Sequence, residues 1–415
     1  MKAIKVHACE FPKGEIDLVT SKSVSNRALI IDFLSGQKSE LKNLSQSDDT
    51  LVLQKLLQQL TAGNENVLDV GLAGTVMRFL TTACCFASQK VILTGADRMK
   101  QRPVKELVEC LRNLGAKINY LEKEGYPPLE IEPSRLKGGY VRIHAGTSSQ
   151  FISSLMLCAP YFKEPLTLEL EGPVVSSSYI AMTAKVMHDF GAETSSDGRL
   201  ITVQNTPYRT IEYTVEADWS SASYFYSLAA LSQQADVVLK GLRMDGVQGD
   251  QAIAEIAKLF GVDSYTEERG VRIIKKNTTI QPFHYDFTLC PDIAQTVAVM
   301  CAGSKLKGVQ LNGLSTLVIK ETDRIQALKN ELSQFNVKAT SLGNESLHID
   351  AVDFIASQKA PVQTYHDHRM AMSFAPLAQK TSVILISDPL VVNKSYHNFW
   401  SDWNKLGCLT EIADI

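Results

Sequence analysis

The sequence predicts a mixed α/β protein of two or three domains that is built from a repeated unit. Three observations lead to this fold class. The chain has 415 residues, more than one hydrophobic core usually organises. Hydrophobic residues make up 45% and charged residues 21%, which is typical of globular proteins and excludes a disordered or collagen-like chain. An amphipathic helix followed by a short strand recurs along the sequence.

The repeated pattern has four clear copies. Each copy is an amphipathic helix, a turn residue, a short strand and a polar turn, and they cover residues 107–125, 181–198, 252–270 and 325–343. The residues that end the helices are Gly115, Gly191, Gly261 and Asn336, spaced by 76, 70 and 75 residues. Gly and Asn favour the left-handed conformation that ends a helix. A shorter copy covers residues 51–63. A period near 70 suits a βαβαββ unit, and six such units, three in each of two domains, fill the chain.

Charge and cysteine usage exclude several classes of function. The 42 basic and 45 acidic residues give a net charge of −3 with no basic tail, which argues against nucleic-acid binding. The eight cysteines include no C-x-x-C pair, so we expect reduced thiols in a cytoplasmic protein. The first residues lack the apolar core of a signal peptide, and no apolar run is long enough to span a membrane. We therefore expect no membrane association.

Five segments place Ser, Thr or Gly just before an apolar helical pattern. They are residues 21–27, 71–78, 147–150, 176–179 and 220–223. Each alone is an ordinary helix cap, but a helix N-terminus also binds anions through free N–H groups. In the first segment Lys22 and Arg27 flank the hydroxyls of Ser23 and Ser25, which favours a phosphate site.

A basic segment, residues 98–103, follows an expected strand. We predict that Arg98, Lys100 and Arg102 project to one side of the strand end and that Pro103 opens the next helix. A solvated surface is an equally good interpretation of these three charges.

Two further segments carry carboxylates beside basic residues. Residues 320–324 start the fourth repeated helix, with Lys320 and Arg324 on one face and Glu321 next to them. Asp292 lies at another helix start, where it is a cap or a general base.

The segment around residue 367 also lies at a helix start. Asp367 precedes an apolar helix as a cap, and Arg369 makes this an anion site rather than a metal site, because the His366 and His368 pair lacks a recognisable third ligand.

The sequence lacks the common cofactor and nucleophile motifs. It has no G-x-x-x-x-G-K-[ST], no G-x-G-x-x-G and no G-x-S-x-G. The remaining inventory of Lys and Arg, helix N-termini and two carboxylates suits substrates that carry phosphate and carboxylate groups. We expect acid–base chemistry with no cofactor and no metal.

Nine motifs in order make the chain resemble the 5-enolpyruvylshikimate-3-phosphate synthase (3-phosphoshikimate 1-carboxyvinyltransferase) family. The motifs are SKSVSNRAL, AGTVMR, LTGADRMKQRP, SSQF, SSSYI, SSASYF, PDIAQT, KETDRI and DHRMAM. The resemblance implies the enolpyruvyl transferase fold, a two-domain inside-out α/β barrel of six βαβαββ units. Residues 1–20 and 217–415 form the first domain, residues 21–216 form the second, and the active site lies in the cleft between them.

The resemblance also implies an activity and its residues. The family transfers the enolpyruvyl group of phosphoenolpyruvate to the 5-hydroxyl of shikimate 3-phosphate, through a tetrahedral ketal, and releases phosphate. The implied ligands of shikimate 3-phosphate are Lys22, Ser23, Arg27, Ser148, Ser149, Gln150, Ser176, Tyr179, Asp292, Thr316 and Lys320. Those of phosphoenolpyruvate are Lys22, Gly74, Arg102, Gln150, Arg324, Arg369 and Lys394. Asp292 takes the hydroxyl proton, Glu321 protonates the methylene carbon, and Lys22 is the third catalytic residue. The implied partners are these small molecules, and we expect a monomer.

The chain departs from the family pattern at four positions. Leu72, Thr316 and His366 stand where the family often has Asn, and Phe79 stands where it often has Pro. Leu72 and Phe79 border the phosphoenolpyruvate loop, so glyphosate sensitivity does not follow from the resemblance. Thr316 is shorter than Asn and holds the shikimate phosphate less directly.

Two other functions stay open. One is that of a UDP-N-acetylglucosamine enolpyruvyl transferase, although the P-G-G-C loop usual in that family is missing. The other is a non-catalytic module that binds phosphate metabolites.

Overall fold

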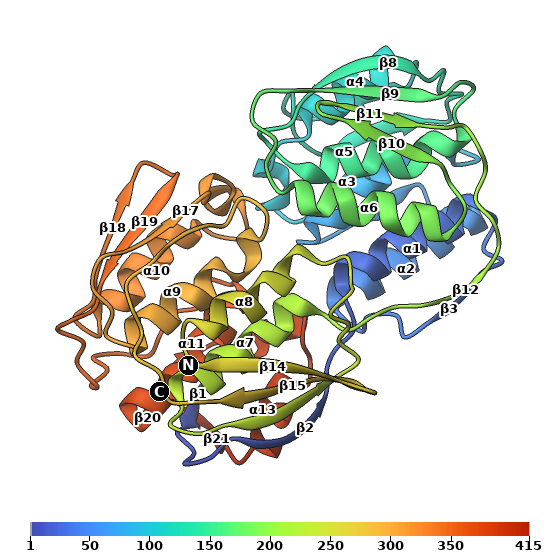
Figure 1. Ribbon diagram of the computed structural model, residues 1–415. Coiled ribbons are helices and arrows are strands. Elements are labelled where there is room, and N and C mark those ends of the chain that lie inside the picture. Colours follow the sequence, from blue (N-terminus) through green and yellow to red (C-terminus); the bar gives the residue numbers. More distant parts are fainter. Residues whose placement is uncertain (1, 415) are drawn as a thin grey trace. The chain divides into compact units, whose positions relative to one another are not determined.

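The computed structural model describes residues 2–414, which form two compact units. The first unit contains the residues up to Thr20 and those from Glu216 onward, and the second runs from Ser21 to Val215 (Figure 1). The chain therefore leaves the first unit and returns to it once. Next to the two crossings, Thr20 and Ala217 form an isolated antiparallel bridge.

The second unit contains two four-stranded sheets of the same topology. One has the order β4 (Val67–Asp69), β5 (Val91–Thr94), β7 (Leu129–Glu132), β6 (Lys117–Tyr120), with helices α3 (Gly74–Ala83) and α4 (Lys105–Asn113). The other has the order β8 (Gly139–His144), β9 (Leu166–Glu171), β11 (Leu200–Val203), β10 (Thr194–Asp197), with α5 (Ser149–Cys158) and α6 (Ser177–Asp189). In each, the first two strands are parallel and a hairpin completes the sheet.

The third sheet of the second unit is smaller. Strand β12 (Glu212–Thr214) pairs in parallel with β3 (Glu40–Lys42), beside helices α1 (Lys22–Leu34) and α2 (Asp48–Ala62). Helix α2 ends at Gly63 with φ 64°, but the next strand, β4, belongs to another sheet. This copy of the unit thus lacks its hairpin.

The first unit repeats the topology with strands from distant parts of the chain. One sheet has the order β2 (Lys13–Asp17), β13 (Asp236–Lys240), β15 (Gly270–Lys275), β14 (Val262–Glu267), with α7 (Trp219–Leu231) and α8 (Ala252–Lys258). Another has the order β16 (His284–Asp286), β17 (Val309–Asn312), β19 (Ser346–Asp350), β18 (Lys338–Leu342), with α9 (Ala294–Gly303) and α10 (Arg324–Ser333). Between β2 and α7 the chain builds the entire second unit.

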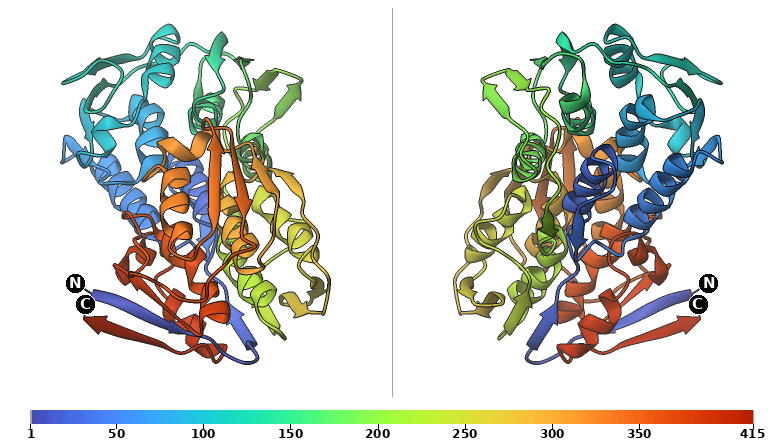
Figure 2. Two further views of the ribbon diagram at one scale, coloured as in Figure 1. Left: turned by 90° about the vertical axis from the view of Figure 1, so that its left-hand side faces the viewer. Right: turned by 90° about the vertical axis from the view of Figure 1, so that its right-hand side faces the viewer.

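The last sheet of the first unit borrows its central strand from the N-terminal end. Its order is β20 (Val383–Ser387), β1 (Lys2–His7), β21 (Thr410–Asp414). The accompanying helices are α11 (His368–Phe374), α12 (Ala378–Thr381) and α13 (Phe399–Lys405). A parallel bridge from Val362 to Ile386 supplies the remaining strand position, so this sheet is a permuted copy of the same unit. Figure 2 shows β1 beside β21 in both views.

The helix ends predicted from the sequence are confirmed. Gly115, Gly191, Gly261 and Asn336 have φ of 100°, 85°, 76° and 58°, in the left-handed region. Each is followed by the expected strand, β6, β10, β14 or β18. One copy was missed. Gly407, with φ 87°, ends the seven-residue helix α13, whose short sequence is too rich in aromatic residues to look amphipathic.

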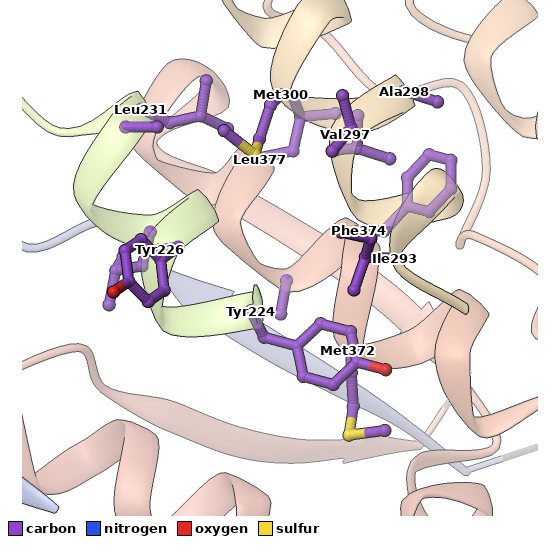
Figure 3. Packing of buried hydrophobic residues seen from close by; sticks show 14 of the residues in the cluster. Tyr224, Tyr226, Leu231, Ile293, Val297, Ala298, Met300, Met372, Phe374 and Leu377 are labelled. Carbon is purple, nitrogen blue, oxygen red and sulfur yellow. The ribbon is translucent and has the colours of Figure 1, made fainter. Parts of the chain in front are cut away.

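Apolar helices form the centre of the first unit. Every residue of α9 and α11 is buried, and in α7 only Ser220 is partly exposed. A helix that is apolar on all sides belongs in a core. Figure 3 shows Tyr224 and Leu231 of α7 packed near Met300 of α9 and Met372 of α11. The sheets lie outside these helices, which confirms the inside-out α/β class for this unit (Figure 1).

No helix within residues 2–414 combines the length and apolarity needed to cross a lipid bilayer.

Candidate active site

Arg324 is the centre of a charged cluster in the first unit. It begins α10, one residue after the N-cap Asp323. Its Nε donates to Asp367 at 2.7 Å, its Nη1 to Asp292 at 3.1 Å and its Nη2 to Glu321 at 3.0 Å. The side chain is only 2% exposed. Burial lowers the pKa of Arg324, but the three carboxylates raise it by more, so the guanidinium stays charged.

Three more cations complete the cluster. Lys394 Nζ lies 2.7 Å from Glu321, and Arg369 Nη2 and Lys320 Nζ lie 3.1 Å and 3.7 Å from Asp292. Burial lowers the pKa of Lys320, although the charge of Asp292 opposes this. We call these seven residues the basic cluster: Asp292, Lys320, Glu321, Arg324, Asp367, Arg369 and Lys394. Its four cations exceed its three carboxylates, so an anionic ligand is favoured there.

The ends of four segments supply these side chains. Asp292 belongs to the 3-10 turn η5 (Pro291–Ile293) ahead of α9, and Glu321 follows the 3-10 helix η6 (Ser315–Ile319). Asp367 caps α11 by accepting from the Arg369 N–H at 2.9 Å, as the sequence predicted. Lys394 ends the 3-10 helix η8 (Pro389–Lys394).

Residues 320–324 do not form the helix turn that was predicted. Asp323 is the N-cap, its carboxylate accepting from Gln326 N, so α10 begins only at Arg324. Lys320 and Glu321 therefore lie in the preceding loop rather than on a helix face. They join the cluster because Asp292 and Arg324 bind them across the loop.

The second unit holds a buried arginine at the start of α1. Arg27 is 2% exposed and makes four hydrogen bonds, to Ser23 O (2.8 Å), Thr183 Oγ1 (2.8 Å), Tyr179 O (3.2 Å) and Ser153 Oγ (3.3 Å). None of these acceptors is a carboxylate. Burial therefore lowers the pKa of Arg27 to about 10, which still leaves a positive charge at neutral pH.

Phe79 also contacts this arginine. It is buried in α3, and its ring centroid lies 5.4 Å from the Arg27 guanidinium carbon. Phe79, which stands where the family often has Pro, thus stabilises the charge of Arg27 through a cation–π contact.

The helix starts predicted in the second unit are present, but their N-terminal caps differ from one helix to the next. Ser21 accepts from Val24 N, and Ser148 accepts from Gln150 N. Ser176 has φ 54° and makes no side-chain cap, so its hydroxyl is not used by the helix. Ala73, not a polar residue, precedes α3. In the first unit Asp218 caps α7, which places Ser220 inside the first turn.

Lys22 and Gln150 have partners that hold their side chains. Lys22 Nζ lies 3.1 Å from Asp49 Oδ2, and Gln150 Nε2 donates to Thr75 Oγ1 at 3.0 Å. Ser149 begins α5 and is buried. The predicted ligands Lys22, Gly74, Ser149 and Tyr179 lie in α1, α3, α5 and α6, respectively.

Arg102 lies against Gly74, which brings two of the predicted phosphoenolpyruvate ligands together. A Cβ at Gly74 would lie 2.6 Å from Arg102 Nη1, so only glycine lets the guanidinium approach the start of α3. Arg78 holds the same loop from inside, donating to Gly74 O at 3.2 Å and Pro103 O at 3.0 Å.

The predicted arrangement of residues 98–103 is wrong. Residues Met99–Gln101 form a 3-10 turn instead of a strand end, and α4 begins two residues after Pro103. Lys100 pairs with Glu122 at 2.9 Å and Arg98 donates to Gln101 at 3.5 Å. A turn rotates successive side chains apart, so the three basic residues do not share one side.

Thr316 presents an unused polar group. It lies in η6 and is 8% exposed, and its Oγ1 has no hydrogen-bond partner within residues 2–414. A buried hydroxyl in this state is available to a ligand.

The sequence patterns did not predict several residues of the site. Asp49, Thr183 and Tyr224 are buried polar groups next to predicted ligands, and Asp250 is a buried carboxylate that is linked to Arg369 through Ser220. Asp49 looks like an ordinary acidic residue in a first helical turn, and the others have no pattern that marks them. Within residues 2–414, no three or more His, Cys, Asp and Glu residues are arranged to hold a metal ion.

Comparison with known proteins agrees with the motifs. The family described as EPSP synthase (3-phosphoshikimate 1-carboxyvinyltransferase) matches residues 58–403. A protein of Bacteroides fragilis (strain YCH46), named 3-phosphoshikimate 1-carboxyvinyltransferase, is 44% identical over 397 residues, which cover 95% of each chain. This chain belongs to the EPSP synthase family. Another relative of that name, from Pasteurella multocida (strain Pm70), is 32% identical and covers 97% of this chain and 98% of its own.

Comparison with solved structures also identifies the EPSP synthase fold. The chain matches the solved EPSP synthase of Acinetobacter baumannii with a TM-score of 0.80 over all of both chains, at 22% identity. The enolpyruvyl transferase fold expected from the motifs is thereby confirmed.

Proposed function

We propose that this EPSP synthase family member is a 3-phosphoshikimate 1-carboxyvinyltransferase. It joins the enolpyruvyl group of phosphoenolpyruvate to the 5-hydroxyl of shikimate 3-phosphate and releases inorganic phosphate. The observation that carries the proposal is the pair of carboxylates, Asp292 and Glu321, bound to one buried guanidinium, Arg324, within a cluster of excess positive charge.

The proposed reaction needs an acid and a base. Glu321 protonates C3 of phosphoenolpyruvate, which develops positive charge at C2, and Asp292 accepts the proton of the 5-hydroxyl as its oxygen bonds to C2. In the elimination Glu321, now deprotonated, takes a proton back from C3 while the bond from C2 to the phosphate oxygen breaks, which leaves the enol ether and inorganic phosphate. The different partners of the two carboxylates support different roles, since Lys394 binds Glu321 whereas Lys320 and Arg369 bind Asp292.

The anionic groups of both substrates need preorganised donors. We assign phosphoenolpyruvate to Lys22, Gly74, Arg102, Gln150, Arg324, Arg369 and Lys394. We assign shikimate 3-phosphate to Lys22, Ser23, Arg27, Ser148, Ser149, Gln150, Ser176, Tyr179, Asp292, Thr316 and Lys320. Positive charge that is already fixed in place stabilises the transition state without reorganisation, and Lys22 serves both substrates in this role.

The assignment has a consequence for the two units. Lys22, Arg27 and Arg102 belong to one unit, and the basic cluster belongs to the other. The proposal therefore requires both units to contribute to one substrate complex. We propose in addition that the protein is cytoplasmic, which its eight free thiols support, and that it acts as a monomer.

The deciding experiment measures phosphate release from phosphoenolpyruvate in the presence of a chelator. Shikimate 3-phosphate and UDP-N-acetylglucosamine are compared as acceptors. Release with shikimate 3-phosphate alone is the expected result. Release with UDP-N-acetylglucosamine would favour the related transferase, and release with neither acceptor from a folded protein would favour a binding module.

A further inference from the structure

A buried carboxylate lies beside the basic cluster and takes no part in the proposed reaction. Asp250 belongs to the 3-10 turn η4 (Gly249–Gln251) and is 4% exposed. Its Oδ2 accepts a hydrogen bond from Ser220 Oγ in the first turn of α7. Its Oδ1 is buried and has no hydrogen-bond partner among residues 2–414. A carboxylate buried with one unsatisfied oxygen is costly unless positive charge lies near it.

The nearby positive charge belongs to Arg369. Its Nη2 donates to the same Ser220 Oγ at 3.4 Å. Burial, followed by the charge of Asp292, raises the pKa of Asp250 to about 7, and the Arg369 guanidinium opposes this rise. Ser220 is thus a bridge between a buried carboxylate and an arginine of the basic cluster.

The directions of the hydrogen bonds explain how the Ser220 bridge orients the Arg369 guanidinium. Ser220 has a single hydroxyl proton, which it donates to Asp250, so the lone pairs of Oγ are left to accept from Arg369. The other amino group of Arg369, Nη1, donates to Tyr224 Oη at 3.3 Å and to the Asp292 main-chain oxygen at 3.1 Å. These acceptors fix the plane of the guanidinium.

A substrate anion bound by Arg369 competes with the carboxylate of Asp292, which lies 3.1 Å from Nη2. The hydrogen bond from Arg369 to Ser220 does not involve the Asp292 carboxylate, so it remains when a substrate anion replaces that carboxylate. We propose that Asp250 is a positioning residue for Arg369, acting through the Ser220 hydroxyl, and that it thereby increases the affinity for phosphoenolpyruvate. This inference rests on the proposed function, which makes Arg369 a ligand of that substrate.

The test compares Asp250→Asn, Ser220→Ala and Ser220→Thr in steady-state kinetics with both substrates varied. For Asp250→Asn and Ser220→Ala we expect the KM for phosphoenolpyruvate to rise roughly tenfold, as for one weakened charge-assisted hydrogen bond. The KM for shikimate 3-phosphate should change less than about twofold. Ser220→Thr keeps the hydroxyl and should stay within about twofold of the wild type. Ser220→Ala removes the link that Asp250→Asn weakens by neutralising the acceptor, so the double variant should be no worse than Ser220→Ala.

Two matched controls lie in the same unit. Asp402→Asn changes another buried aspartate that accepts from a hydroxyl, that of Tyr396 at 2.8 Å. Ser232→Ala removes a hydroxyl that donates to Leu228 O at the other end of α7. Neither contacts Arg369, so both should keep the wild-type KM for phosphoenolpyruvate.

The outcomes separate this inference from the proposed function. If the wild type releases no phosphate with shikimate 3-phosphate, both are overturned. If the wild type is active but Asp250→Asn and Ser220→Ala keep its KM for phosphoenolpyruvate, only the role of Asp250 is overturned. An equal rise of both KM values would assign Asp250 a purely structural role and contradict the proposal. Should Asp250→Asn fail to fold, the two Ser220 variants test the proposal. A KM for phosphoenolpyruvate that rises in Ser220→Ala but not in Ser220→Thr supports it, and equal KM values in the two variants contradict it.

Discussion

At the scale of single residues, the members of the basic cluster stabilise one another's buried charges. Arg324 and Asp367 are almost completely buried, and an unpaired charge at either position would be strongly destabilising. Asp292 and Glu321 remain slightly exposed, at 15% and 16% of their side-chain surface. Asp367 thus has no exposed side-chain surface, whereas Asp292 and Glu321 each have some, as their proposed roles as base and acid require.

This division predicts the effect of neutral substitutions at the two accessible carboxylates. We expect Asp292→Asn and Glu321→Gln each to lower kcat by about 10²- to 10⁴-fold, because each removes one proton-transfer group. Thermal unfolding should show both variants folded. Asp402→Asn, a buried aspartate outside the cluster, serves as the control for kcat. Turnover within about twofold of the wild type in Asp292→Asn and Glu321→Gln would contradict their assignment as base and acid.

The buried carboxyl of Asp250 predicts a pH dependence of stability. Its pKa of about 7, caused chiefly by burial, lies above the value near 3.9 expected in the unfolded chain. Its contribution to stability is therefore fully present below about pH 4 and is lost as the pH rises through about 7. Asp250→Asn does not titrate, so it should gain stability relative to the wild type across this range.

Urea unfolding at pH 5 and pH 8 measures this effect. All three tryptophans, Trp219, Trp400 and Trp403, lie in the first unit, so their fluorescence reports the unfolding of the unit that contains Asp250. We expect the free energy of unfolding of Asp250→Asn, relative to wild type, to be higher at pH 8 than at pH 5. The same difference at both values would show that Asp250 does not titrate in this range.

The sequence indicated candidate ligands of the site but not the groups that hold them in place. Lys22, Arg27, Arg324 and Asp367 belong to motifs at helix starts, where local chemistry already indicates anion binding. Asp250 has no such context. Its proposed role depends on its burial and on its link to Arg369 through Ser220, which no local sequence pattern reveals.

At the scale of elements, the βαβαββ unit is repeated with changes at both ends of the chain. The helix ends were predictable because the left-handed conformation is a local requirement that Gly and Asn meet most easily. The strand pairings were not, since β1 and β2 complete sheets whose other strands lie more than 200 residues away. The turn at residues 98–103 was mistaken for a strand end because alternating charges do not distinguish the two.

Two helix ends of the first unit offer a matched test of the left-handed positions. Gly407 has φ 87° and no atom within 4 Å of an added Cβ, whereas at Gly261, with φ 76°, that Cβ would lie 2.3 Å from Lys276 O. Gly407→Ala should cost about 1 to 2 kcal/mol through backbone strain alone. Gly261→Ala should cost more, because a main-chain carbonyl must also move.

Tryptophan fluorescence during urea unfolding measures both variants in one unit. Equal losses would show that the contact with Lys276 relaxes freely. No loss in Gly407→Ala would contradict the strained conformation at that helix end.

At the scale of the whole molecule, the assigned ligands of shikimate 3-phosphate belong to both units. Arg27 is fixed in one unit and Lys320 in the other. A ligand that binds both should favour a more compact state of the chain.

Small-angle X-ray scattering should therefore show a smaller radius of gyration when shikimate 3-phosphate is added. Lys320→Ala, which removes one proposed contact from the first unit, should require more ligand for the same change. Scattering that does not change at saturating ligand would contradict the requirement that both units bind it.

The borrowed strand β1 has a consequence for the order of synthesis. As the chain leaves the ribosome, residues 21–215 emerge as one continuous stretch, so the second unit is fully synthesised before the rest of the first unit. Strand β1 precedes that stretch in the chain, yet its partners β20 and β21 follow it, at Val383–Ser387 and Thr410–Asp414. Strand β1 therefore stays unpaired in this sheet while the whole second unit and most of the first are translated, and it is enclosed only when β20 and β21 have been made.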